Sequence, residues 1–207
     1  SWSTPTYDAW RQCQTEDAAY DYYYKCVQLI GSNEPDKRWL LKNPGHIEQL
    51  DLLFAIFPDA KVIQTHRDPA KAIPSLCALL MHLHPIYEEG RSDKRAHNML
   101  AREVAKWARD IRRCEPVRQA HPGQVLDVVH ADFHGQPMAV LERIYGFIGM
   151  EIGEELRSAF AHRIAAKPEL QHGVHRYDLA DFGMSAERVR EQFGDYAERF
   201  DLVEKSA

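Results

Sequence analysis

Features that would place this chain in a membrane or outside the cell are missing from its sequence. Its 207 residues contain no apolar run that approaches the ~20 residues of a membrane span. The first residues, Ser-Trp-Ser-Thr-Pro, do not read as a signal peptide. The four cysteines are scattered and form no Cys-x-x-Cys pair. We therefore expect a cytoplasmic protein with reduced thiols and no membrane span.

An overall basic charge is also absent. The net charge is −5 and the isoelectric point is about 6.1. Proteins that bind nucleic acid through the phosphate backbone usually carry a basic surface. We therefore expect no nucleic-acid partner, although a local anion site on an acidic protein is still reasonable.

Common catalytic and metal-binding motifs do not occur either. The sequence has no Gly-x-Ser-x-Gly, no His-Glu-x-x-His and no Gly-x-x-x-x-Gly-Lys, and it has no Gly-Lys pair at all. Its eleven histidines include the close pairs His82-x-His84 and His172-x-x-His175, but no cysteine pair accompanies them. We expect no bound metal ion and no serine hydrolase chemistry.

What is present is a pattern of buried strands separated by helices. Apolar runs at 38–42, 61–66 and 125–130 predict parallel strands that are covered on both faces, and hence an α/β fold. Ligands bind beyond the carboxyl ends of such strands. Five polar residues lie at or just past the first two ends: Lys42, His46, His66, Arg67 and Asp68.

The turn after the second strand has the chemistry of an anion site. Asp68 can cap a helix that starts at Pro69, where free amides and the helix dipole favour an anion. Arg67 adds a planar fork that matches phosphate oxygens, and Ser75 adds a hydroxyl farther along. Pro74 is expected to break or kink this helix near Ser75. The simpler alternative is a surface arginine and a buried helix serine.

Helices are expected on both sides of these strands. Besides the segment between the first two strands, helical spacing predicts helices at 5–30, 69–84, 99–117, 136–149, 152–166 and 185–200. Aromatic residues along 5–30 either pack in the core or line an acceptor pocket. Residues 85–97 are polar and predict a surface loop, and Ser185 is expected to cap the last helix.

Taken together, these motifs resemble the bacterial branch of the sulfotransferase family, which uses 3′-phosphoadenosine 5′-phosphosulfate (PAPS) as sulfuryl donor. The segments that carry the resemblance are Trp39–His46, Phe57–Val62, Thr65–Pro69, Pro74-Ser75, Val129–Phe133, His172–Tyr177 and Asp181–Gly183. The resemblance covers nearly all of this chain. It implies a P-loop-like three-layer fold with a short parallel sheet flanked by many helices.

The resemblance also implies roles for particular residues. Arg67 and Ser75 match the family's arginine and serine that hold the 3′-phosphate. Lys42 matches the lysine that supports sulfuryl transfer, and His46 matches, less firmly, the base that deprotonates the acceptor. Two further cofactor contacts are implied, a second phosphate clamp and an adenine contact, by Arg176 and His130. The simpler alternatives are a surface lysine, a histidine that caps the next helix and a core histidine.

One departure from the family concerns the start of the chain. The family begins with a strand and a glycine-rich loop that binds the 5′-phosphosulfate, and nothing here matches that loop. We therefore expect a single domain over 1–207 that corresponds to the later two-thirds of the family domain. It comprises a helical lead-in (1–37), an α/β core (38–150) and a helical C-terminal part (151–207). A missing N-terminal segment or a second chain is expected to complete the sheet.

Three hypotheses for function remain open at this point. The first is a PAPS-dependent sulfotransferase that acts on a hydroxyl or amine of a small-molecule acceptor. The second is a catalytically incomplete fragment that binds the 3′-phosphate of adenosine bisphosphate. The third is an interaction module that has the fold without the activity.

Overall fold

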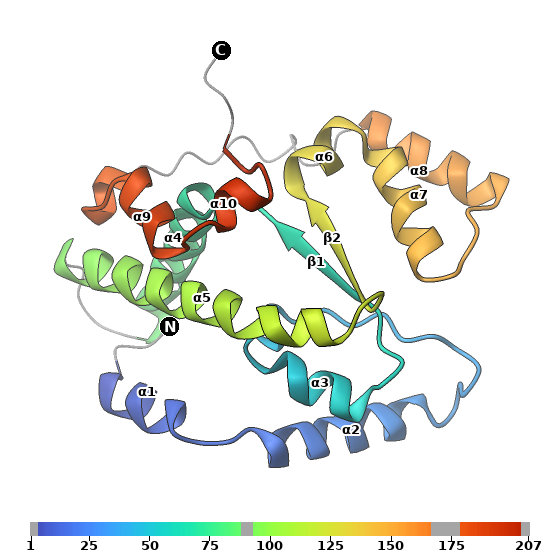
Figure 1. The fold of residues 1–207 in the computed structure, drawn as a ribbon, viewed down its shortest axis with the longest axis horizontal. Coiled ribbons are helices and arrows are strands. Elements are labelled where there is room, and N and C mark those ends of the chain that lie inside the picture. Colours follow the sequence, from blue (N-terminus) through green and yellow to red (C-terminus); the bar gives the residue numbers. More distant parts are fainter. Residues whose placement is uncertain (1–3, 88–92, 167–178, 204–207) are drawn as a thin grey trace. The chain divides into compact units, whose positions relative to one another are not determined.

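The computed structural model describes residues 4–87, 93–166 and 179–203 (Figure 1). These residues form two compact units. The first consists of Ser1–Ala60 and Asp110–Gln124, and the second of Lys61–Arg109 and Val125–Ala207. Each unit has its own core. The predicted division into lead-in, core and C-terminal part stays a prediction.

The first unit is helical. It contains α1 (Pro5–Gln12), α2 (Asp17–Gly31), the 3-10 helix η1 (Pro44–Gln49), α3 (Leu50–Ile56) and the last turns of α5 (Asp93–Ala120). Leu50, Leu53 and Phe54 are buried, and the Phe54 ring stacks on His121 of the α5–β2 turn with centroids 4.4 Å apart. This small core joins η1 and α3 to the end of α5.

The single helix predicted for 5–30 is wrong, because the chain turns between α1 and α2. Arg11 at the end of α1 pairs with Glu16 and, at 3.0 Å, with Glu48. These ion pairs stabilise the turn. The aromatic residues are divided accordingly: Tyr20 is buried, whereas Tyr7 and Trp10 are more than half exposed. The aromatic stripe is therefore core only around Tyr20.

The strand predicted at 38–42 is also wrong. Residues 38–43 have no regular secondary structure, and the Leu40 side chain is 91% exposed. The only sheet in the described part of the chain has two strands, and neither pairs with this segment. A strand forms only where a neighbour accepts its backbone hydrogen bonds. Without that neighbour, the apolar run lies at the surface.

The second unit is built on a two-stranded parallel sheet. Strand β1 (Val62–His66) pairs with β2 (Val125–Val129), with Val62 opposite Val125 and His66 opposite Val129. The predictions of these two strands and of an α/β fold with a short parallel sheet flanked by helices are confirmed. Because the five residues of β1 pair one to one with the five residues of β2, both strands end at the same edge of the sheet. The next helices, α4 (Pro69–Tyr87) and α6 (His130–Gly135), start from this edge.

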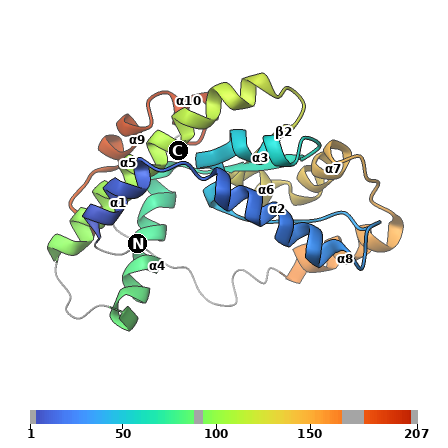
Figure 2. The ribbon, with the colours of Figure 1, turned by 90° about the horizontal axis from the view of Figure 1, so that it is seen from below.

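In the described residues, further helices of this unit follow α6. They are α7 (Pro137–Phe147), α8 (Glu154–Ala166), the 3-10 helix η3 (Leu179–Phe182), α9 (Ala186–Gln192) and α10 (Tyr196–Arg199). Helices α7 and α8 lie side by side, as Figures 1 and 2 show. Leu100 and Val104 on α5 and Val189 on α9 are fully buried, and α9 packs against α4.

Two helix boundaries differ from the prediction for local reasons. Helix α4 continues through the buried Pro74 to Tyr87, and α5 begins at Asp93, so most of the predicted loop 85–97 is helical. The last helix is capped as expected, since Ser185 accepts from the Arg188 amide at 3.3 Å. It then divides into α9 and α10, because Gly194 adopts φ +62° between them.

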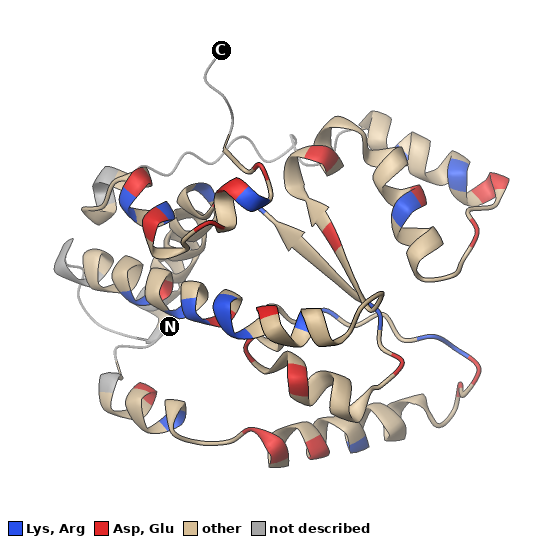
Figure 3. Ribbon diagram, in the orientation of Figure 1, with Lys and Arg blue, Asp and Glu red and all other residues tan. Residues whose placement is uncertain are grey.

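Helix α5 carries both acidic and basic residues, and its carboxylates Glu103 and Asp110 are buried. Figure 3 shows Lys and Arg interspersed with Asp and Glu along this helix. Arg102 lies 3.7 Å from the buried Glu103, and Arg118 lies 3.9 Å from Glu115.

No helix in the described ranges is long and apolar enough to cross a bilayer.

A buried ion pair ties the start of α4 to α9. The Asp68 carboxylate is 2% exposed and accepts from Arg190 Nε at 3.1 Å and from Arg190 Nη2 at 2.6 Å. The hydrogen bond to Asp68 raises the pKa of Arg190, so the guanidinium stays charged. The bidentate contact joins two segments that lie more than a hundred residues apart in the sequence.

Replacing this arginine tests the contact. We expect Arg190→Ala to lower the free energy of unfolding in urea by about 2–3 kcal/mol, because it leaves the Asp68 carboxylate buried and unpaired, while partial exposure of the pair moderates the loss. Arg188→Ala, at an exposed position of the same helix, serves as control and should change it by less than about 0.5 kcal/mol. Equal effects of the two variants would show that the ion pair does not hold α9.

Candidate functional site

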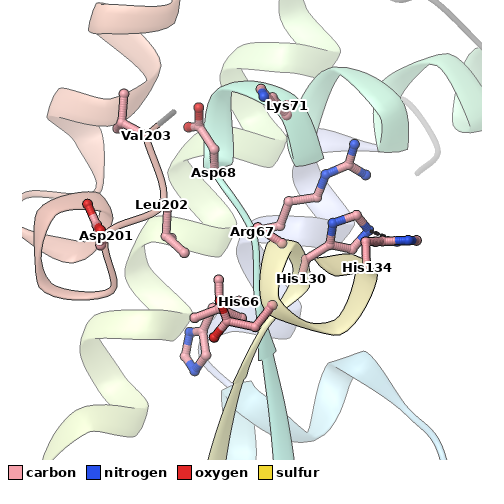
Figure 4. Close-up of a pocket in the computed structure, with 12 residues that line it drawn as sticks. His66, Arg67, Asp68, Lys71, His130, His134, Asp201, Leu202 and Val203 are labelled. Carbon is pink, nitrogen blue, oxygen red and sulfur yellow. Dashed lines mark hydrogen bonds between the residues drawn. The ribbon is translucent and has the colours of Figure 1, made fainter. Parts of the chain in front are cut away.

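A cavity of about 650 Å³ lies in the second unit, at the edge where β1 and β2 end. Three segments form its wall: the end of β1 with the start of α4, the end of β2 with α6, and the segment after α10 (Figure 4). The lining residues are His66, Arg67, Asp68, Lys71, Val129, His130, Ala131, Asp132, His134, Asp201, Leu202 and Val203. The position matches the sequence-based expectation for ligands of a parallel sheet.

Arg67 is the first residue after β1, and its side chain is exposed in this cavity. The neighbouring carboxylate, Asp68, is already bound to Arg190. No carboxylate in the described ranges forms an ion pair with Arg67. Figure 4 shows the Arg67 side chain extending toward His130 and His134, with Lys71 on the first turn of α4. The charge of Arg67 is therefore available to an anion.

The start of α4 is capped as predicted, but it offers no amides to a ligand. Asp68 Oδ1 accepts from the Ala70 amide at 3.0 Å, and the Asp68 carbonyl accepts from the amides of Lys71 and Ala72, each at 2.9 Å. Pro69 has no amide hydrogen. The expectation of free amides at this helix start is therefore wrong. An anion here would be held by cationic side chains.

His130 and His134 form a pair on α6. Their Nε2 atoms lie 3.1 Å apart, and both rings are exposed. Partial burial and the nearby charges of Arg67, His134 and Lys71 lower the pKa of His130. The alternative of a core histidine at 130 is therefore wrong. Sequence reasoning missed His134, although its spacing of four residues from His130 was a signal.

Of the other two predicted cofactor residues, only Ser75 belongs to the described part of the chain. Ser75 is half-buried on α4, one turn after Lys71, and is not a lining residue. Arg176 lies outside the described residues, as does the pair His172 and His175. Within the described part of the chain, no three His, Cys, Asp or Glu side chains come together as a metal-binding group would.

His66 lines the cavity at the end of β1, and its ring is buried. The side chain is completely buried. Its Nδ1 is hydrogen-bonded to Tyr196 Oη at 2.9 Å and its Nε2 to Asp127 Oδ1 at 2.7 Å, and its ring stacks on Phe200 with centroids 3.9 Å apart. His66 therefore fixes the C-terminal segment that supplies one wall of the cavity.

The two predicted catalytic residues, Lys42 and His46, belong to the first unit. Lys42 is exposed in the irregular segment before η1. The turn that follows forms as predicted, with Asn43 Oδ1 accepting from the Gly45 amide at 2.9 Å. Asn43 rather than His46 is therefore the helix cap, and the alternative of a capping role for His46 is wrong.

His46 has an aromatic environment. Its Nδ1 is hydrogen-bonded to Tyr20 Oη at 2.9 Å, and its ring lies against Tyr23 with centroids 5.6 Å apart. Burial lowers the pKa of His46, which favours the neutral imidazole that a base needs. Burial also raises the pKa of Tyr20 to about 12, so this phenol keeps its proton.

The known proteins that are similar to this chain include several sulfotransferases. The curated proteins include the omega-hydroxy-beta-dihydromenaquinone-9 sulfotransferase Stf3 of Mycobacterium bovis and of Mycobacterium tuberculosis. Each is 28% identical over 115 residues, which is 55% of this chain and 29% of the relative. The match thus spans less than a third of the length of these relatives.

Solved structures extend the likeness over most of the chain. The sulfotransferase STF1 of Mycobacterium tuberculosis H37Rv matches with a TM-score of 0.75 and 33% identity, over 93% of this chain and 49% of that one. STF9 of Mycobacterium avium matches in fold with a TM-score of 0.79 at 24% identity, over 92% of this chain and 48% of that one. In both structures the match covers about half of the relative.

The family comparison agrees with both results. The sequence model described as "Sulfotransferase family" matches residues 4–154, which is well over half of the chain and includes the two strands, α6 and η1. The resemblance that the sequence motifs indicated is thereby confirmed, and the chain belongs to the sulfotransferase family.

Proposed function

We propose that this chain acts in sulfuryl transfer from PAPS to a hydroxyl or amine of a small-molecule acceptor, and that the cavity of the second unit receives the 3′-phosphate of the donor. The observation that carries this proposal is the arrangement of Arg67, Lys71 and His130 around one cavity at the strand ends. Membership of the sulfotransferase family supports it.

The side chains of the cavity suit a phosphate group. Arg67 offers a planar set of donors that matches phosphate oxygens, and Lys71 offers a point charge. Asp68 does not compete with a phosphate for Arg67, because Arg190 already neutralises this carboxylate. The volume of about 650 Å³ lies in the range of small-molecule sites. His130 is proposed to contact the adenine edge from the adjoining wall.

The remaining roles are proposals that rest on family membership. Ser75 and Arg176 would add contacts to the 3′-phosphate. In sulfuryl transfer the main tasks of the protein are in-line positioning and stabilisation of charge on the leaving oxygens. Lys42 would supply a positive charge to the leaving phosphate, and His46 would accept the proton of the acceptor.

The contact with Tyr20 sets a condition on the base role of His46. A neutral imidazole carries one hydrogen, and its other nitrogen accepts. Since Nδ1 faces Tyr20, a base acting through Nε2 requires that Nδ1 carry the hydrogen and donate it to Tyr20 Oη. Tyr20 is then a positioning residue that fixes the tautomer of His46.

Binding of adenosine 3′,5′-bisphosphate tests the phosphate site. We expect Arg67→Ala to raise the Kd by about 10- to 100-fold, because a charge-assisted hydrogen bond contributes roughly 1.5–3 kcal/mol. Isothermal titration calorimetry of the whole chain measures it. Arg163→Ala, at an exposed position on α8, is the matched control and should leave the Kd unchanged. Unaltered binding by Arg67→Ala would contradict the placement of the phosphate.

Titration of His46 by NMR tests the role of Tyr20. We expect the pKa of His46 to lie below its ordinary value of ~6.5. In Tyr20→Phe it should fall further, because the imidazolium loses a hydrogen-bond acceptor at Nδ1. A rise instead would show that Tyr20 donates to Nδ1, which leaves the hydrogen on Nε2 and argues against a base at that atom. The ring of His121 in the same unit serves as reference, and its chemical shifts at a fixed pH should be the same in both proteins.

The same depressed pKa predicts the pH dependence of stability. Because His46 binds a proton more readily in the unfolded chain, its contribution to stability is present above about pH 6.5 and is lost as the pH falls through the folded-state pKa. We expect the free energy of unfolding to decrease less on acidification in His46→Gln than in the parent chain. An identical decrease in the two proteins would contradict this expectation.

A further inference from the structure

The contact between His130 and His134 restricts how many protons the pair can hold. Two Nε2 atoms 3.1 Å apart form a hydrogen bond only if one carries a hydrogen and the other does not. If both rings were charged, two N–H groups would point at each other. The pair is therefore stable with both rings neutral or with one extra proton shared between them.

The groups that face this pair decide which state is favoured. Partial burial lowers the pKa of His130, and the charges of Arg67, which follows β1, and of Lys71 on α4 lower it further. Asp132 lies on the same helix as the pair and Asp201 on the C-terminal wall, while Asp68 is neutralised by Arg190. In the cavity as described, the neighbouring cations thus oppose a charge on His130.

We propose that His130 and His134 form a proton-linked part of the phosphate site, so that a phosphate monoester dianion binds together with one proton taken up by the pair. This inference rests on the proposed function and adds His134 as a binding residue. The dianion neutralises Arg67 and Lys71, which removes the repulsion that kept the pair neutral. A solvent proton then binds to one imidazole nitrogen, and the resulting imidazolium donates to a phosphate oxygen.

The linkage has a definite sign. The pKa of the pair is higher with the dianion bound than without it. The added affinity is therefore complete below the lower of these two values and is lost as the pH rises through the higher one. Uptake of one proton limits the change in Kd to about tenfold per pH unit. The phosphate itself gains a proton near pH ~6, so the useful window lies above that value.

Calorimetry in two buffers of different ionisation enthalpy measures the proton uptake directly. We expect the whole chain to bind adenosine 3′,5′-bisphosphate at about pH 7 with an uptake approaching one proton, and with a Kd that rises by several-fold from about pH 6.5 to about pH 8. Adenosine 5′-monophosphate, which lacks the 3′-phosphate, should bind more weakly and with little uptake. A chelator in all samples excludes a metal ion bridging the two rings.

Variants of the pair complete the test. His134→Asn should abolish most of the uptake and flatten the pH dependence of Kd, whereas His162→Asn, at an exposed position on α8, should change neither. Binding by the parent chain without proton uptake overturns this inference while leaving the proposed function intact, and so does full uptake by His134→Asn. Failure of the parent chain to bind the bisphosphate overturns both. The measurement on the parent chain decides the matter even where the variant does not fold.

Discussion

Two hydrogen bonds of one buried histidine hold together three elements that are far apart in the sequence. His66 ends β1, Asp127 belongs to β2, and Tyr196 begins α10. A completely buried imidazole needs partners for both nitrogens, and here each partner comes from a different element. The segment after α10 is thereby fixed beside the strand ends. Without this network one wall of the cavity would have no fixed position.

The ion pair between Asp68 and Arg190 has a comparable effect on charge. A carboxylate beside Arg67 would ordinarily neutralise it, and the cavity would then have little attraction for an anion. Because Asp68 turns to Arg190 and to the Ala70 amide, Arg67 keeps its charge within the cavity. The same arrangement uses the first amides of α4, which explains why the site is built from side chains. Stability and the proposed anion recognition thus depend on the same carboxylate.

The comparisons agree on the protein family and differ in how much of the chain they match. Family membership covers residues 4–154, and this chain matches about half of each solved relative. Arg67 and His130 lie in the second unit, while Lys42 and His46 lie in the first. Leu40 belongs to an apolar segment that has no strand partner in the described residues. The side chain of Leu40 is therefore exposed although the sequence pattern predicts burial.

Local patterns in the sequence determined the features that depend on neighbouring residues. Strands β1 and β2, the cap by Asp68, the cap by Ser185 and the turn at Asn43 were all predictable, because the groups involved lie within a few residues of one another. The place of Arg67 at a strand end followed from the same patterns. These features require only backbone geometry and the alternation of apolar and polar side chains.

Tertiary structure alone decided the features that depend on distant partners. The sequence places His66 at a strand end without showing that Asp127 and Tyr196 bury it. It gives the apolar run at 38–42 without showing that no strand pairs with it. It also leaves undecided which carboxylate neutralises which arginine. In each case the outcome depends on whether residues dozens of positions apart come into contact. Such contacts form only when the whole unit packs.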